Sequence, residues 1–279
     1  MKHAIAAALL ASAALAGSAQ AQGSGTVNLA YVEWSDTVVA TNILAAVLED
    51  EGYTVNMTPL PGAAMWQAVA TGEADAHVAG WLPVTHAAYY EELQDQLEVL
   101  EPNIEGARLG WAVPEYMDIS SIEDIAADPS VVNGQVIGID PGAGLMAASE
   151  RAIEDYDLDV TLVEGTDATM TAALQDAISR EEPIVVTAWT PHWMFSRFDL
   201  KYLEDPQVSL GEEETVHNVV RAGLQEDMPD VYRIISNFRL TLPDEEAIML
   251  ENEEGADPAE TARAWVDANP DTVAEWTAE

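Results

Sequence analysis

The sequence contains no cysteine and few basic residues. Its 279 residues include 10 Lys+Arg against 50 Asp+Glu, which gives a formal net charge of −40. Without cysteine the protein can form neither disulfides nor a lipid-modified cysteine anchor. So large an excess of negative charge excludes nucleic acid and anionic lipid as partners. Because the acidic residues are spread along the whole chain, they indicate a solvated surface suited to high salt.

The sequence motifs of common enzyme classes are missing as well. There is no G-x-S-x-G, H-E-x-x-H or Walker-type loop, and the five histidines show no metal-ligand spacing. We therefore expect a protein that is not an enzyme and that uses no cofactor and no metal. A binding function is the class that remains.

Apolar runs long enough to span a membrane are absent after the first 21 residues. Residues 1–21 combine a short basic start, a small-residue apolar run and the cleavage pattern Ala19-Gln20-Ala21. This combination is typical of a secretory signal peptide. We expect cleavage before Gln22 and a soluble mature protein in the periplasm.

The rest of the chain alternates strand-like and helix-like segments, and the pattern occurs twice. In the first half the expected strands are 27–34, 53–60 and 74–83, with helices at 37–52 and 62–73. In the second half the strands are 136–144, 160–165 and 183–191, with helices at 145–157 and 167–178. Alternation of this kind predicts parallel sheets covered by helices.

Matched motifs relate the two halves. GAAMWQA (62–68) aligns with DATMTAA (167–173), and AGWLPVTH (79–86) aligns with TAWTPHWM (187–194). The matched order and the matched tryptophans indicate an internal duplication that produces two similar α/β lobes.

Two further apolar segments are expected to connect the lobes. ARLGWAVP (107–114) and VHNVVRAG (216–223) are predicted to be strands that cross between them as a two-stranded hinge. LEVLEP (97–102) is expected to turn away at its proline. The C-terminal segment should pack back on the first lobe. The predicted domains are a first lobe of residues 26–112 plus 216–279 and a second lobe of residues 113–215.

Tryptophan stands at three of the predicted strand ends, namely Trp34, Trp81 and Trp189. In open parallel sheets the carboxyl ends of the strands are where ligands bind. Three aromatic faces favour a cation without hydrogen-bond donors, such as a quaternary ammonium. The glycine-rich turn at 140–145 opens a helix and offers free backbone N–H groups to an anion. A small zwitterion with a trimethylammonium group and a carboxylate fits both features.

Four segments of the chain closely resemble one known family. They are WTPHWMFSRFDLKYLEDP (189–206), IGIDPGAGLM (137–146), GAAMWQAVATGEADA (62–76) and GWLPVTH (80–86). They are similar to the glycine betaine-binding proteins of ABC importers, and the resemblance covers nearly all of the mature chain. It implies a two-lobed periplasmic binding protein, monomeric, that closes over its ligand and is recognised by a membrane permease.

The resemblance also implies the binding residues. The indoles of Trp34, Trp81 and Trp189 would form a prism around the quaternary ammonium. The ligand carboxylate would be held by the backbone N–H groups of Gly144 and Leu145, with His86 close to it.

Asp36 leaves the choice of ligand open. A related choline-binding branch looks similar at this position, and a buried carboxylate would favour a cation that has no carboxylate of its own. The residue could equally cap the helix that starts near Thr37, and we prefer this second interpretation. Choline, a sulfonium compound, and a sensor domain that reports to a receptor stay open as alternatives.

Overall fold

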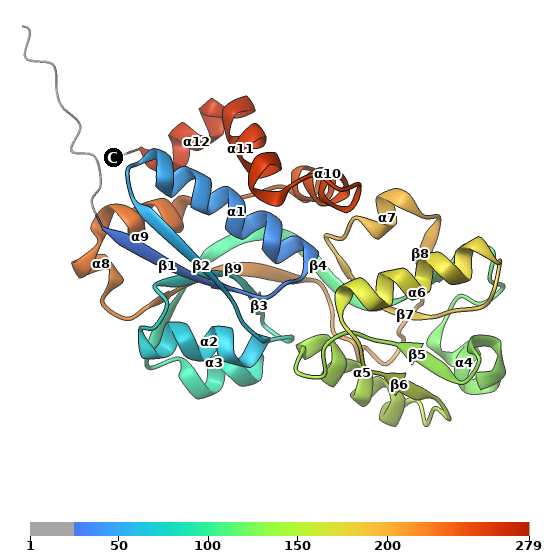
Figure 1. The fold of residues 1–279 in the computed structure, drawn as a ribbon. Coiled ribbons are helices and arrows are strands. Elements are labelled where there is room, and N and C mark those ends of the chain that lie inside the picture. The colour runs from blue at the N-terminus through green and yellow to red at the C-terminus, as the bar shows by residue number, and fades with distance from the viewer. Residues whose placement is uncertain (1–24, 279) are drawn as a thin grey trace, which may run out of the picture.

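The computed structural model describes residues 25–278 and shows two lobes joined by a shared sheet (Figure 1). The predicted signal peptide, residues 1–21, lies outside the described residues. Within residues 25–278, no helix is long and apolar enough to cross a membrane. Neighbouring strands follow the order β2-β1-β3-β9-β4-β7-β5-β6, and β8 pairs with β4.

The first lobe is built on three parallel strands. They are β1 (Thr26–Tyr31), β2 (Thr54–Pro59) and β3 (Ala76–Leu82), with α1 (Ser35–Asp50) and α2 (Gly62–Thr71) as the connections. β1 lies between β2 and β3. Nearly every apolar side chain of α1 is buried, because this helix is covered on both sides, by the sheet and by the C-terminal helices.

The second lobe repeats this arrangement. Its strands are β5 (Gln135–Ile137), β6 (Thr161–Val163) and β7 (Val186–Thr190), with α5 (Gly144–Asp155) and α6 (Asp167–Ser179) as the connections. β5 lies between β6 and β7, and both pairings are parallel. The two-lobed α/β fold predicted from the sequence is therefore confirmed, and both lobes have the same strand order.

The connection between the lobes differs from the prediction in two respects. β4 (Leu97–Pro114) is one long strand that continues through Pro102 with irregular register instead of ending there. It pairs with β9 (Glu214–Arg221) as far as Ala107 and with β7 from Arg108 onward. Among the strands of residues 25–278, β9 pairs with β3 and β4 alone, so the chain has already returned to the first lobe before segment 216–223 begins. The lobe limits at 112/113 and 215/216 stay proposals.

The remaining elements are short or belong to the C-terminal segment. They are α3 (Ala87–Leu93), α4 (Ile122–Ala127), a 3₁₀ turn (Pro129–Val132), α7 (Met194–Arg197), β8 (Leu200–Tyr202), α8 (Leu224–Asp227), α9 (Pro229–Asn237), α10 (Leu242–Glu253), α11 (Pro258–Ala268) and α12 (Pro270–Thr277). As predicted, the C-terminal helices cover the first lobe, where α11 lies along α1 (Figure 1). Arg263 on α11 donates to the Asp50 carboxylate at 2.6 Å and to the Ala46 carbonyl at 3.0 Å.

Candidate functional site

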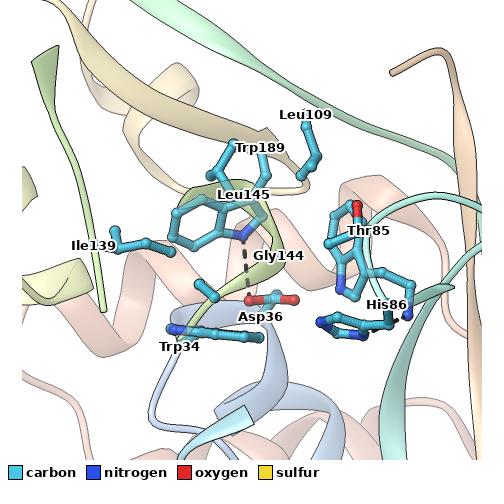
Figure 2. Close-up of a pocket in the computed structure, with 11 residues that line it drawn as sticks. Trp34, Asp36, Thr85, His86, Leu109, Ile139, Gly144, Leu145 and Trp189 are labelled. Atoms are coloured by element: carbon cyan, nitrogen blue, oxygen red, sulfur yellow. Dashed lines mark hydrogen bonds between the residues drawn. The ribbon is translucent and has the colours of Figure 1, made fainter. Parts of the chain in front are cut away.

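The ends of β1, β3 and β7 and the start of α5 meet at one pocket between the lobes (Figure 2). Its cavity volume is about 20 Å³, little more than one water molecule requires, so the lining residues lie close together in this closed form. All six residues predicted from the sequence are among its lining. The lining residues are Trp34, Asp36, Trp81, Thr85, His86, Leu109, Ile139, Ala143, Gly144, Leu145 and Trp189.

Two of the pocket's indoles are hydrogen-bonded across the cleft. The Trp34 indole N–H, from the first lobe, donates to the Asp140 carboxylate at 2.6 Å. The Trp189 indole N–H, from the second lobe, donates to the Asp36 carboxylate at 3.2 Å. Trp81 is 3 % exposed and supplies a further ring. Since the bonds join opposite lobes, this arrangement of the rings depends on the lobes being closed.

Asp36 does not cap α1, contrary to the interpretation preferred from the sequence. The helix begins at Ser35, with Trp34 at the capping position and no side-chain cap. Asp36 is the second helical residue, and its carboxylate lies in the pocket between Trp189, Trp34 and His86 (Figure 2). The sequence could not show this, because Trp189, the partner of Asp36, comes from the other lobe.

Burial raises the pKa of Asp36 to about 6, and the charge of Asp167 adds to the rise. His192 and the backbone N–H groups of Thr37 and Asp36 lower this pKa but do not offset burial. The carboxyl group of Asp36 is therefore only partly protonated near pH 6 and mostly ionised at neutral pH.

Replacing Asp36 by Asn should stabilise the protein at neutral pH. A carboxyl group whose pKa is raised on folding stabilises the fold fully at low pH, and this stabilisation is lost as the pH rises through the folded-state pKa. For Asp36 this stabilisation is lost between about pH 4 and pH 6. A pKa shift of this size corresponds to about 3 kcal/mol in the free energy of unfolding. Asn keeps an acceptor for the Trp189 indole without a charge.

Unfolding by denaturant between pH 4 and pH 8 measures this effect. At pH 4 the free energy of unfolding of D36N should be equal to or lower than that of wild type, and it should rise relative to wild type up to about pH 6. A difference that stays constant over this range would contradict the account.

The start of α5 offers unused hydrogen-bond donors to the pocket. Gly144 and Leu145 are its first two residues, and no acceptor for their backbone N–H groups is found among the described residues. Such groups at a helix start, together with the helix dipole, favour an anion. The pocket therefore combines aromatic faces with a place for a negative charge.

His86 provides a further donor. Its Nδ1 accepts the backbone N–H of Trp81 at 3.1 Å. Burial lowers the pKa of His86 to about 4, and the Ala79 carbonyl, which favours the charged form, does not offset burial. The ring is therefore neutral at pH 7 and its proton lies on Nε2. Nε2 is buried and has no hydrogen-bond partner among the described residues, so it can donate to a bound anion.

The sequence reasoning missed the apolar part of the lining and one polar residue. Leu109, Ile139 and Ala143 complete the walls, and Thr85 reaches the start of α5 from the first lobe. Leu109 could have been found from the alternation along its strand, since it precedes the buried Trp111 by two residues. Thr85 could not, because its importance comes from the approach of the other lobe. Within residues 25–278, no three His, Asp or Glu side chains are arranged to hold a metal ion.

One family description matches most of the chain. The substrate binding domain of ABC-type glycine betaine transport systems matches residues 25–268. The glycine betaine/carnitine transport binding protein GbuC of Listeria monocytogenes is 48% identical over 149 residues, which cover 52% of this chain and 50% of that protein. The match thus spans about half the length of this curated relative.

Solved structures with bound ligands are similar over nearly the whole chain. Lactococcal OpuAC, in its closed conformation with glycine betaine, has a TM-score of 0.87 and 39% identity, with 91% of this chain and 99% of that one covered. An ABC-transporter choline binding protein in complex with choline has a TM-score of 0.84 and 28% identity, with 90% and 91% covered.

Proposed function

This chain belongs to the family of substrate-binding domains of ABC-type glycine betaine transport systems, and we propose that it binds glycine betaine, or a close betaine, between its lobes. Members of this family bind a small molecule for an importer and are not enzymes. The relatives whose descriptions name glycine betaine agree with this ligand. An extracytoplasmic location, a monomeric state and delivery to a membrane permease are parts of the same proposal.

One observation supports the ligand more than any other. Three indoles, two from the first lobe and one from the second, lie around the same pocket as the N–H groups of Gly144 and Leu145, for which residues 25–278 supply no acceptor. A trimethylammonium group has no hydrogen-bond donors and is attracted to aromatic faces. A carboxylate attached to it would reach the start of α5 and the Nε2–H of His86. The pocket thus offers aromatic faces to the ammonium end of a betaine and hydrogen-bond donors to its carboxylate end.

The forces available are sufficient for useful affinity. Each ring over a desolvated cation contributes about 0.5 to 2 kcal/mol. Hydrogen bonds from N–H groups to a carboxylate contribute about 1.5 to 3 kcal/mol each. After the cost of association, such a sum is compatible with micromolar binding, near −8 kcal/mol. A ligand that touches both lobes stabilises the closed form, the form that a permease would recognise.

A second candidate ligand is choline, and Asp36 is the observation that favours it. The carboxylate of Asp36 lies inside the pocket and would attract a cation that has no carboxylate of its own. It would repel the carboxylate of a betaine. Against choline stands the unpaired helix start of α5, which a ligand without an anionic group would leave unused.

A titration followed by tryptophan fluorescence tests the proposal. We expect glycine betaine to give saturable binding near micromolar concentration and choline to bind at least about tenfold more weakly, a difference of roughly 1.4 kcal/mol. The preference should persist at high salt, because charges inside a closed pocket are screened far less than those on the surface. Tighter binding of choline would assign the pocket to the second candidate, and binding of neither would refute both.

A further inference from the structure

The internal repeat places the starts of two helices in equivalent positions facing the cleft. Ser35 is the first residue of α1 in the first lobe, and Gly144 is the first residue of α5 in the second. The helix that follows in each lobe also begins at equivalent positions. Its first residue is Gly62 in α2 and Asp167 in α6. Equivalent positions of the repeat therefore carry a carboxylate in the second lobe and no side chain in the first.

In the second lobe, Asp167 reaches across the cleft to the start of α1. Its carboxylate Oδ2 accepts the backbone N–H of Ser35 at 3.0 Å, and the residue is 7 % exposed. Burial raises the pKa of Asp167, but the neighbouring His192 ring and the hydrogen bond from Ser35 bring it below its ordinary value. A carboxylate of the protein thus satisfies a donor at the positive end of this helix.

Asp167 is held in place from behind by His192. Nδ1 of this ring accepts the backbone N–H of Met194 at 3.1 Å, which leaves Nε2 as the donor nitrogen. Nε2 is 3.1 Å from Oδ1 of Asp167 and donates to it. The ring of His192 also meets the indole of Trp189 edge-on, with centroids 4.4 Å apart. The carboxylate at α1 is therefore fixed to one wall of the pocket.

At the equivalent place in the first lobe, Gly62 has no side chain to extend toward the turn that precedes α5. A Cβ built on Gly62 would have only ordinary contacts, 3.7 Å to Cη2 of Trp34 and 3.9 Å to the carbonyl oxygen of Gly142. The backbone N–H groups of Gly144 and Leu145 have no acceptor among the described residues, unlike that of Ser35. Of two related helix starts, one is occupied by the protein's own carboxylate and one is not.

We propose that Asp167 and Gly62 are positioning residues that fix the orientation of the ligand in the pocket. Asp167 occupies the anion position at α1, so that the ligand carboxylate can bind only at α5, where Gly62 keeps the equivalent position free. This inference rests on the proposed function, since it assumes a ligand with a carboxylate. Asp167 also stabilises the closed form, because its hydrogen bond with Ser35 joins the two lobes.

Substituting Gly62 tests the inference. In G62D the new carboxylate competes with the ligand for the N–H groups at α5 and repels its carboxylate, so glycine betaine affinity should fall by about a hundredfold. G62N has the same size without the charge and is the matched control. The loss of glycine betaine affinity in G62N should be at least about tenfold smaller than in G62D, since Asn lacks the negative charge of Asp. Choline, which has no carboxylate, should not bind more weakly to G62D than to wild type. Thermal unfolding of both variants checks that the fold is retained.

The outcomes separate this inference from the proposed function. If wild type binds glycine betaine and G62D and G62N lose affinity equally, only bulk matters at this position and the inference is wrong. If wild type binds no betaine, the proposed function itself fails. A second variant, D167G, should release glycine betaine about tenfold faster with little change in the association rate, because it loses a bond made in the closed form. An unchanged dissociation rate in stopped-flow measurements would remove Asp167 from the closed-state contacts.

Discussion

Replacing Gly144 by Ala should prevent the lobes from closing and weaken glycine betaine binding by about a hundredfold, the equivalent of roughly 3 kcal/mol of overpacking. A Cβ at this position would overlap the carbonyl oxygen of Thr85 in the opposite lobe and lie 2.6 Å from its Cγ2. The loop that carries Thr85 has little freedom to retreat. Glu214 accepts the backbone N–H groups of Val84 and Thr85 at 2.6 and 2.9 Å.

G144A should make closure of the lobes less favourable and leave the stability of the fold unchanged, because the two lobes can avoid the overlap by staying apart. Thermal unfolding of G144A without ligand should therefore be close to that of wild type, while calorimetry shows the lost affinity. Gly142 provides a matched control in the same turn, since a Cβ there would meet nothing within 4 Å. G142A should bind as wild type does. Wild-type affinity in G144A would mean that the ligand does not require the closed form described here.

Replacing Trp81 by Ala should weaken glycine betaine binding at least about tenfold, since one ring over a desolvated cation is worth up to roughly 2 kcal/mol. Trp81 is the penultimate residue of β3 and is 3 % exposed. The backbone of Trp81 also donates to Nδ1 of His86, so the mutation should leave the backbone contacts of the site in place. The fold should persist, because the indole lines the pocket between the lobes.

Two variants control for this result in calorimetric titrations. W81F keeps an aromatic face and should recover a large part of the affinity. W265A removes a tryptophan of α11 that stacks on Trp276, away from the pocket, and should bind as wild type does. Equal affinities of W81A and wild type would exclude Trp81 from the binding site.

The repeat explains why much of the fold could be predicted from the sequence. The alternation of strands and helices can be read from short segments of the sequence. It recurs in two halves with matched motifs, so the prediction of an element in one half can be checked against the equivalent element in the other. The tryptophans and the glycine-rich turn follow strands whose carboxyl ends share one edge, so the sequence predicts that they lie close together, and they line one pocket. The sequence does not predict that β4 continues through Pro102, since a proline usually indicates the end of a strand. In the structure Pro102 lies where the register of β4 and β9 is irregular.

Contacts between the lobes could not be predicted in this way. The bonds from Trp34 to Asp140 and from Trp189 to Asp36 join residues more than a hundred positions apart and depend on how the lobes close. Asp36 looked like a helix cap because capping is the local role of an acid at that position. Its place in the pocket is set by the opposite lobe.

A crystal structure of the protein with glycine betaine would show where the ligand binds and how it is oriented. We expect the trimethylammonium group among the indoles of Trp34, Trp81 and Trp189, with the ligand carboxylate on the N–H groups of Gly144 and Leu145. A ligand outside this pocket would refute the proposed binding site, as would a ligand whose carboxylate points away from α5.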